Sequence, residues 1–141
     1  MKVVKTLKVT PEDFFGLLED SLKYDIEKYG RKTAGEYVLE QGFTYHKKIR
    51  YKKKEYRTLT EVKILQAPWR YQVLIQNDMG NFLISYEISQ KEEGKIEVVY
   101  REDTADENGC PNTSFAKELF GRLQAGSIKR RLSQMEQQIK G

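Results

Sequence analysis

The spacing of hydrophobic and polar residues changes period twice along the chain, and these changes divide it into predicted elements. Residues 2–9 alternate with a period close to two, which predicts a first strand. Thr10 and Pro11 then form a helix start, with a hydroxyl N-cap followed by proline at the first helical position. Apolar residues at helical spacing predict a helix from there to Gly30. A shorter helix is predicted from about Thr33 to Gln41.

From Phe43 onward the period is two, and turn signals recur at four places, which predicts an antiparallel meander of five strands. The turn signals are Lys52-Lys53-Lys54, Ala67-Pro68-Trp69, Asp78-Met79-Gly80 and Glu92-Glu93-Gly94. The predicted inner face carries Phe43, Tyr45, Ile49, Tyr51, Tyr56, Val62, Ile64, Tyr71, Val73, Ile75, Phe82, Ile84, Tyr86, Ile88, Ile96, Val98 and Tyr100. The opposite parity is mainly charged or polar, although it includes Leu59, Leu65, Leu74, Leu83 and Val99. One sheet face is therefore expected to need a cover.

The predicted cover is a long helix from about Thr113 to Lys140, which contains no proline. Its apolar residues change side along the helix, because an early set and a late set point in nearly opposite directions at 100° per residue. The early set is Phe115, Leu119 and Leu123, and the late set is Ile128, Leu132, Met135 and Ile139. We therefore predict either a kink or break at Ala125-Gly126-Ser127 or a second contact surface for the last three turns.

Tyrosine is concentrated on the predicted inner face, beside two threonines and a lysine. A buried phenol needs a hydrogen-bond partner, so a dry core uses few of them, whereas a cavity holding water or an amphipathic ligand can use many. The predicted ligand-binding residues are Tyr45, Lys47, Tyr56, Thr58, Thr60, Tyr71, Tyr86 and Tyr100. Two arrangements are open: the phenol rings close the space, or their hydroxyls support water that a ligand displaces. Lys47 would orient an anionic group if it points inward, but a lysine near a strand end usually snorkels outward.

Composition limits the classes of function. The 141 residues fit a single domain, 1–141, and the mean hydropathy of −0.73 with no long apolar run excludes a transmembrane helix. The N-terminus does not resemble a signal peptide, so we expect a cytoplasmic protein. The single cysteine, Cys110, cannot form an internal disulfide, and no ligand spacing for a metal or motif for a cofactor is present. A net charge of +4 decides little about partners.

The order of elements resembles the START-like, or polyketide cyclase-like, helix-grip superfamily. MKVVKTLKVTPEDFFGLLEDSL, the early GFTY and the terminal helix together resemble a bacterial branch known only as a domain of unknown function. The resemblance implies an α+β fold with a curved six-stranded antiparallel sheet, two short N-terminal helices and a long C-terminal helix packed in the concave face. It also implies a cavity between sheet and last helix, where members of the superfamily hold hydrophobic molecules and some act as cyclases or hydrolases. Six strands rather than seven implies a smaller sheet than in the plant-type members.

Two alternative activities are weaker readings of the sequence. The segment from His46 to Arg57 interleaves basic and aromatic residues, as nucleic-acid-binding proteins do, but the outward parity of its basic residues fits a solvated hairpin better. Catalysis would need a positioned acid, base or nucleophile in the cavity. Asp25, Glu36 and Glu102 could approach its mouth, but single carboxylates at such places are usually surface charges. We assign no catalytic residue and favour a non-enzymatic protein.

The prediction is therefore the binding of a small hydrophobic or amphipathic molecule between the curved sheet and the last helix. The alternative is a regulatory or assembly module that acts through its outer surface. Trp69 and the late apolar set of the terminal helix are the residues available for such contacts. A homodimer would use Ile128, Leu132, Met135 and Ile139.

Overall fold

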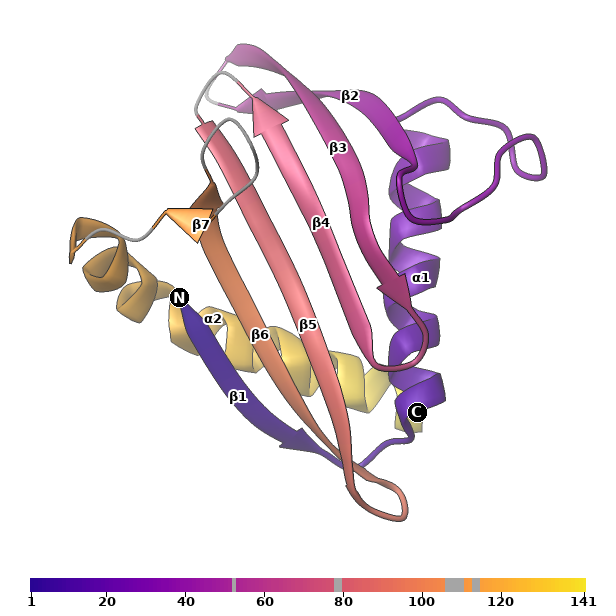
Figure 1. The fold of residues 1–141 in the computed structure, drawn as a ribbon, viewed down its shortest axis with the longest axis vertical. Coiled ribbons are helices and arrows are strands. Elements are labelled where there is room, and N and C mark those ends of the chain that lie inside the picture. Colours follow the sequence, from indigo (N-terminus) through magenta and orange to yellow (C-terminus); the bar gives the residue numbers. More distant parts are fainter. Residues whose placement is uncertain (52, 78–79, 106–110, 113–114) are drawn as a thin grey trace.

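An antiparallel sheet with two helices on one of its faces forms the framework of the protein. The computed structural model describes residues 1–51, 53–77, 80–105, 111–112 and 115–141. The elements are β1 (Lys2–Leu7), α1 (Pro11–Lys28), β2 (Thr44–Tyr51), β3 (Lys54–Gln66), β4 (Arg70–Asn77), β5 (Gly80–Glu92), β6 (Lys95–Ala105), β7 (Pro111–Asn112) and α2 (Phe115–Lys140). Figure 1 shows the sheet from its uncovered side, with both helices behind it.

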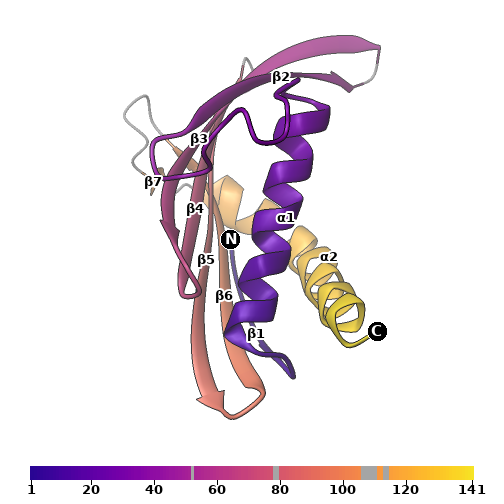
Figure 2. The ribbon, with the colours of Figure 1, turned by 90° about the vertical axis from the view of Figure 1, so that its right-hand side faces the viewer.

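The strand order is β1-β6-β5-β4-β3-β2, and every neighbouring pair is antiparallel. The two-residue β7 adds to this path by pairing with β6. The first strand thus joins the end of the meander, which leaves β1 and β2 as the outer strands of the six long ones. Figure 2 shows that α1 and α2 cover the same face of the curved sheet. The predicted helix-grip architecture is confirmed in its six-stranded sheet, its N-terminal helix and its covering C-terminal helix.

Helix α1 begins as its sequence predicts. The Thr10 hydroxyl oxygen accepts a hydrogen bond of 3.1 Å from the Asp13 backbone N–H, and Pro11 occupies the first turn where no N–H is needed. Its buried face points to the sheet at helical spacing. The residues of this face are Pro11, Phe14, Phe15, Leu18, Leu22 and Ile26. Burial of these side chains fixes the helix against the sheet.

The second short helix predicted over Thr33 to Gln41 is wrong, because this segment forms turns. The Glu36 N–H bonds to the Thr33 carbonyl three residues back, and Gly35 has φ of +83°. A residue in the left-handed region ends a run of helical hydrogen bonds. A side chain instead links the segment to α1, because the Tyr37 hydroxyl donates a hydrogen bond to the Glu27 carboxylate at 2.7 Å.

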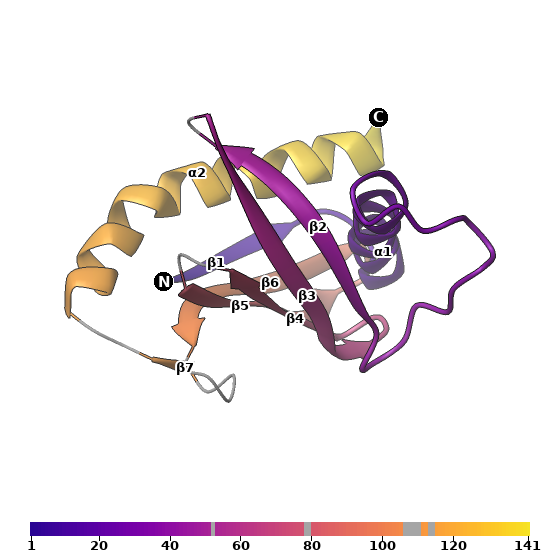
Figure 3. The same cartoon turned by 90° about the horizontal axis from the view of Figure 1, so that it is seen from above.

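The C-terminal helix runs from Phe115 to Lys140 without a break, so of the predicted kink or break at Ala125-Gly126-Ser127 the break is wrong. Figure 3 shows that the helix follows a curved path across the face of the sheet. The side chains of the early apolar set lie outside the described part, so the predicted change of contact surface stays a prediction. Ile128 and Leu132 are buried in the core of their own chain, and Met135 and Ile139 pack against it. Two residues of the predicted dimer surface are thus buried and two partly buried within one molecule, and dimer formation stays a prediction.

A β-bulge changes the parity of β3 near its end. Up to Val62 the strand pairs as predicted, but the next pairs are Ile64 with Gln72 and Leu65 with Tyr71. One extra residue in a bulged strand reverses the faces of the residues beyond it. The predicted faces of Ile64 and Leu65 were therefore wrong, because Leu65 packs against the core and Ile64 pairs with a residue of the outer face.

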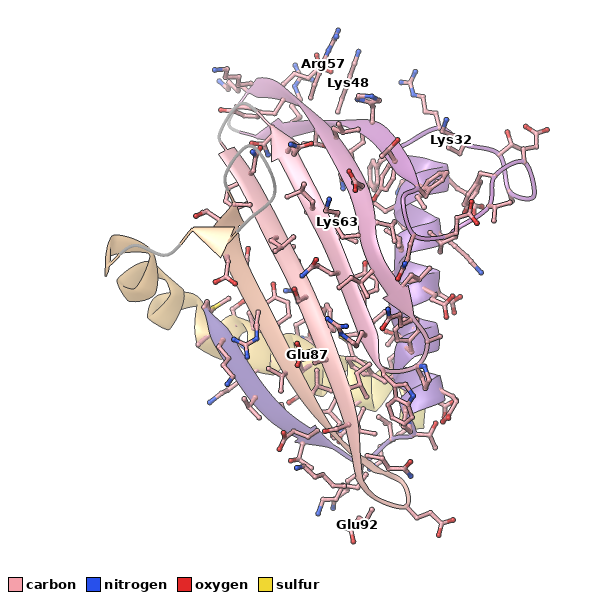
Figure 4. All side chains as sticks on the ribbon, viewed as in Figure 1. Lys32, Lys48, Arg57, Lys63, Glu87 and Glu92 are labelled. Carbon is pink, nitrogen blue, oxygen red and sulfur yellow. The ribbon has the colours of Figure 1, made fainter. Side chains whose placement is uncertain are left out.

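The other inner positions of the meander supply the sheet side of the core. Most of them are buried, including Val62, Val73, Ile88, Ile96 and Val98, and the four tyrosines discussed below. The outer face is mainly polar, as Figure 4 shows for Lys63 and Glu87. Two leucines predicted to face outward, Leu74 and Leu83, pair directly across β4 and β5 and are buried among these polar neighbours. The amphipathic pattern thus places the core between the sheet and the two helices.

Gly30 allows the end of α1 to approach the edge strand β2. A Cβ atom at this position would lie 2.5 Å from the Ile26 carbonyl oxygen and 3.0 Å from a ring carbon of Tyr45. The first distance is far below any ordinary contact, and its partner is a backbone atom that cannot turn away. Only glycine therefore fits where the helix end meets Tyr45.

We expect the substitution Gly30→Ala to lower the free energy of unfolding by about 1–3 kcal/mol through this overlap. Gly16→Ala in the same helix is the matched control, because a Cβ there meets nothing within 4 Å. The control should be neutral or raise stability by up to about 1 kcal/mol through helix propensity. Urea unfolding followed by circular dichroism measures both, and equal stability of the two variants would contradict the close approach.

Candidate functional site

A pocket of about 370 Å³ lies between the inner face of the sheet, α1 and the last turns of α2. Its sheet side carries Tyr45, Lys47, Thr60, Tyr71, Val73, Ile75, Ile84, Tyr86 and Tyr100. Its helix side carries Leu17, Leu18, Ser21, Leu22, Asp25, Arg131, Met135 and Gln138. Ser21, Arg131 and Gln138 are exposed, so they stand at its mouth, whereas the tyrosines form its buried wall. We call this hollow the inner pocket.

Six of the eight residues predicted to bind a ligand line the inner pocket, namely Tyr45, Lys47, Thr60, Tyr71, Tyr86 and Tyr100. Tyr56 and Thr58 do not. Register places both on the inner face, opposite Ile49 and Lys47, but Tyr56 lies farther along the hairpin with the Lys54 ammonium over its ring. The Thr58 hydroxyl donates to the Lys47 carbonyl at 3.3 Å and is buried beneath the strands. Ligand binding by the other six remains a prediction.

The sequence pattern does not identify the helix side of the inner pocket, apart from Asp25, which it allows at the mouth of a cavity. Ser21 and Asp25 are four residues apart and adjoin the apolar stripe of α1, while Arg131, Met135 and Gln138 follow one another at helical spacing on α2. Polar residues at the border of an apolar stripe were the available signal. Whether these polar residues line the pocket depends on which border of the apolar stripe faces the sheet, and tertiary packing decides this.

Asp25 links the end of α1 to β2 through two side chains. The Lys47 ammonium lies 2.9 Å from both carboxylate oxygens, and the Tyr45 hydroxyl donates to Oδ2 at 2.5 Å. The carboxylate and the ammonium are mostly buried, with side-chain exposures of 24% and 17%. Lys47 therefore points inward, but Asp25 already neutralises its charge. It is not a free cation for an anionic ligand, as the sequence had suggested it could be.

Three tyrosines form a chain of edge-to-face contacts along the sheet wall. Tyr86 packs against Tyr71 with ring centroids 5.6 Å apart and against Tyr100 at 5.1 Å. Burial is the main cause that raises the pKa of Tyr71, of Tyr86 and of Tyr100 above the ordinary tyrosine value. Burial, with the Asp25 carboxylate as a second cause, also raises the pKa of Tyr45. The wall therefore presents neutral hydroxyls, which can donate or accept hydrogen bonds.

The hydroxyls of the inner pocket are not equally engaged. Tyr45 donates to Asp25, and Tyr100 donates to the Glu102 carboxylate at 3.0 Å. Thr60 lies beside the Tyr45 phenol and lowers its pKa, but its buried oxygen Oγ1 makes no hydrogen bond of normal geometry to any described residue. A hydroxyl in such a position lacks its full set of hydrogen bonds. It could serve a water or a polar ligand atom.

Arg131 brings a positive charge to the mouth of the inner pocket. Its guanidinium carbon lies 5.8 Å from the centre of the Tyr100 ring, a cation–π distance, and its charge counteracts the raised pKa of Tyr86. Within the described part of the chain the guanidinium forms no ion pair. A cation beside neutral phenols and apolar carbon suits an amphipathic molecule that carries an anionic group.

The groups considered for catalysis are arranged for other roles. Asp25 is bound to Lys47 and Tyr45, Glu102 accepts from Tyr100, and Glu36 is exposed in the turn segment. Cys110 lies outside the described residues. Among the residues that the structure does describe, no three acidic, histidine or cysteine side chains gather as a metal site. No described helix is both long and apolar enough to cross a bilayer.

We expect the buried phenols to resist ionisation in alkaline solution. Their raised folded-state pKa values mean that the folded chain keeps protons which the unfolded chain releases above the ordinary value of 10.0. Stability is therefore complete below pH 10.0 and falls as the pH rises above it. Tyrosinate absorbance during a pH titration should show two phases, the second coinciding with unfolding by circular dichroism. A single phase with every tyrosine ionised in the folded protein would contradict the buried wall.

We also expect Asp25→Asn to destabilise the protein, because it leaves the mostly buried Lys47 ammonium without its counter-charge. The expected loss is about 1.5–3 kcal/mol, the range for hydrogen bonds to charged groups. Asp20→Asn is the matched control, since Asp20 is an exposed acid of the same helix. Chemical denaturation measures both losses, and in the double variant Asp25→Asn/Lys47→Met part of the loss should be recovered. An unchanged stability of Asp25→Asn would show that the bridge contributes nothing.

Known proteins with a similar fold were found at low sequence identity. A Staphylococcus epidermidis protein solved by NMR has a TM-score of 0.64 at 14% identity, covering 99% of this chain and 88% of its own. Ara h 8.0201 has a TM-score of 0.58 at 14% identity, with 99% and 95% covered. An HSP90 activator from Plasmodium falciparum has a TM-score of 0.51 at 14% identity, with 92% and 87% covered. These likenesses show the helix-grip fold and nothing about the ligand.

At the level of sequence, no protein with a curated description matches the chain. A family model does match it, over residues 1–120, which is most of its length. The family is described as a domain of unknown function, in agreement with the resemblance seen in the N-terminal segment and the early GFTY. The chain belongs to the DUF3284 family.

Proposed function

We propose that the protein binds a small amphipathic molecule in the inner pocket, with an apolar body against the sheet and an anionic group at Arg131. The observation that carries this proposal is the combination of a 370 Å³ hollow with a wall of neutral phenols and a cation at its mouth. The residues proposed to contact the ligand are Tyr45, Thr60, Tyr71, Tyr86, Tyr100 and Arg131. Lys47 acts indirectly, because it holds Asp25 and thereby the Tyr45 hydroxyl.

The size of the hollow supports a binding role. A dry void of this volume would cost about 9 kcal/mol at about 24 cal/mol per Å³, a large part of the usual stability of about 5–15 kcal/mol. The hydroxyls and the open mouth allow water to fill it instead. Water held against apolar side chains such as Val73, Ile75 and Ile84 is readily displaced by an apolar ligand. Displacement of this water is the proposed source of affinity.

The fold supports the same proposal. In the superfamily that the chain resembles, hydrophobic molecules lie between the curved sheet and the last helix, and residues of both line the inner pocket here. The inner pocket is not purely apolar, because the hydroxyls of its tyrosines and of Thr60 can form hydrogen bonds to the oxygen atoms of a ligand. No step of the proposal requires bond making or breaking. The function proposed is therefore binding and not catalysis.

We expect dodecanoate to bind the protein, and filling the inner pocket to abolish this binding. Ile84→Trp places a large ring in the hollow, whereas Val4→Trp adds the same ring at a half-exposed residue outside it. Isothermal titration calorimetry should show binding for the wild type and Val4→Trp, and none for Ile84→Trp. Circular dichroism checks that each variant is folded. Native mass spectrometry of freshly purified protein should also find a bound small molecule.

The proposed contact between Arg131 and an anionic group is tested by comparing dodecanoate with the uncharged dodecanol. Arg131→Gln should weaken the binding of dodecanoate by about tenfold, because one charged hydrogen bond is lost, and should leave the binding of dodecanol nearly unchanged. Equal weakening of both would remove Arg131 as the anionic anchor while keeping the apolar site. Failure of both probes with the wild type, together with no copurified molecule, would overturn the proposed function.

A further inference from the structure

A second hollow, of about 460 Å³, lies on the other side of the junction between α1 and β2. Its lining residues are Lys28, Tyr29, Gly30, Arg31, His46, Lys47, Lys48 and Arg57. We call it the basic pocket, because five of these side chains are lysine or arginine and none is acidic. Lys47 is the single residue that lines both hollows, and its charge is neutralised by Asp25. The two hollows are thus chemically separate.

The other cations of the basic pocket are not neutralised within the described chain. Lys28, Arg31, Lys48 and Arg57 form no ion pair with any described residue, although four such pairs occur away from this pocket in the described part of the molecule. Lys48 on β2 and Arg57 on β3 are directly opposite in the antiparallel register. Like charges in this position repel and destabilise the sheet. An anion between them would turn this repulsion into attraction.

Protection of a sheet edge explains only part of this arrangement. Lysine on the outer strand β2 would discourage pairing with another chain. That purpose does not require Arg57 on the next strand inward, nor Lys28 and Arg31 at the end of α1. Figure 4 shows Lys48 and Arg57 close together and projecting in the same direction at one end of the molecule. Cations from three separate elements therefore converge on one hollow.

Part of the basic pocket is held in place before any ligand arrives. The Lys28 ammonium donates to the Tyr24 hydroxyl at 2.8 Å and lies 5.3 Å from the ring centres of both Tyr24 and Tyr29. Gly30 permits the close contact of the helix end with Tyr45 that brings this group beside β2. A site with preset cations loses less entropy when an anion binds.

The geometry points to a binding site for a small phosphate-bearing molecule in the basic pocket. Arginine presents a planar fork that matches phosphate oxygens, and several cations around one hollow suit an anion with more than one charge. A nucleic-acid strand would need a basic surface that continues along the hairpin. Here the basic surface is interrupted, because the acid Glu55 stands opposite Arg50 two pairs beyond Lys48 and Arg57, before Lys53 and Lys54 at the turn. The hollow therefore fits a compact anion better than a long polymer.

Calorimetric titration with pyrophosphate, in buffer free of phosphate and sulfate, tests this proposal. We expect one bound pyrophosphate per chain, and at least tenfold weaker binding by Lys48→Gln/Arg57→Gln. Lys129→Gln/Arg130→Gln is the matched control, because it removes the same charges from exposed positions of α2 and should leave pyrophosphate binding nearly unchanged. Adenosine triphosphate should bind at the same site, and adenosine should not bind.

A second measurement separates binding from folding. Without pyrophosphate, Lys48→Gln/Arg57→Gln should raise the midpoint of thermal unfolding, because it relieves the repulsion between the two cations. Addition of pyrophosphate should raise the midpoint of the wild type and leave that of this variant unchanged. Absence of pyrophosphate binding, or equal loss in the α2 control, would overturn the proposal. The proposal would also be overturned if the protein bound single-stranded oligothymidylate or phosphatidylserine vesicles but bound neither pyrophosphate nor adenosine triphosphate. Dodecanoate binding is independent of all these outcomes.

Discussion

The structure depends on a bridge between the end of α1 and the edge strand β2, made by one carboxylate. Asp25 receives hydrogen bonds from Tyr45 and Lys47, which are successive inward positions of the strand. Gly30 lets the helix end come close enough for this contact. The inner pocket lies on one side of the bridge and the basic pocket on the other. A mostly buried charge pair with its hydrogen bonds satisfied can hold such a junction, whereas either ion alone would be costly.

The bridge also explains the electrical character of the inner pocket. The buried phenols have raised pKa values and stay neutral, and Asp25 and Lys47 cancel one another. Arg131 at the mouth is then the one charge of the described lining that is not balanced by another lining residue. The pocket is neutral and hydroxyl-rich at its wall and positive at its entrance. This polarity gives a bound molecule a preferred direction, independent of what the molecule is.

Much of the fold could be predicted because the spacing of apolar residues within a long segment indicates its secondary structure. The cap at Thr10, the stripe of α1 and the period of two after Phe43 each depend on neighbouring residues only. Errors arose where the outcome depends on distant contacts or on one backbone angle. The bulge after Val62 reverses the end of β3, and Gly35 turns a segment with helical composition into turns. The inner tyrosines were found by parity, but Asp25 and Arg131 required knowledge of how two helices sit on the sheet.

The placement of charge matters more in this protein than its sum. The net charge of +4 arises from 25 basic and 21 acidic residues and suggested no particular partner. Yet pairing elsewhere in the described chain, as between Lys63 and Glu61 or Lys95 and Glu92, leaves a group of unpaired cations at the α1 and β2 junction. Electrostatic fields at this range are set by local groups, because salt screens charges more than about 10 Å away. A weakly basic chain can therefore present a strongly basic site, because the fold adds Lys28 and Arg31 to the basic segment from His46 to Arg57.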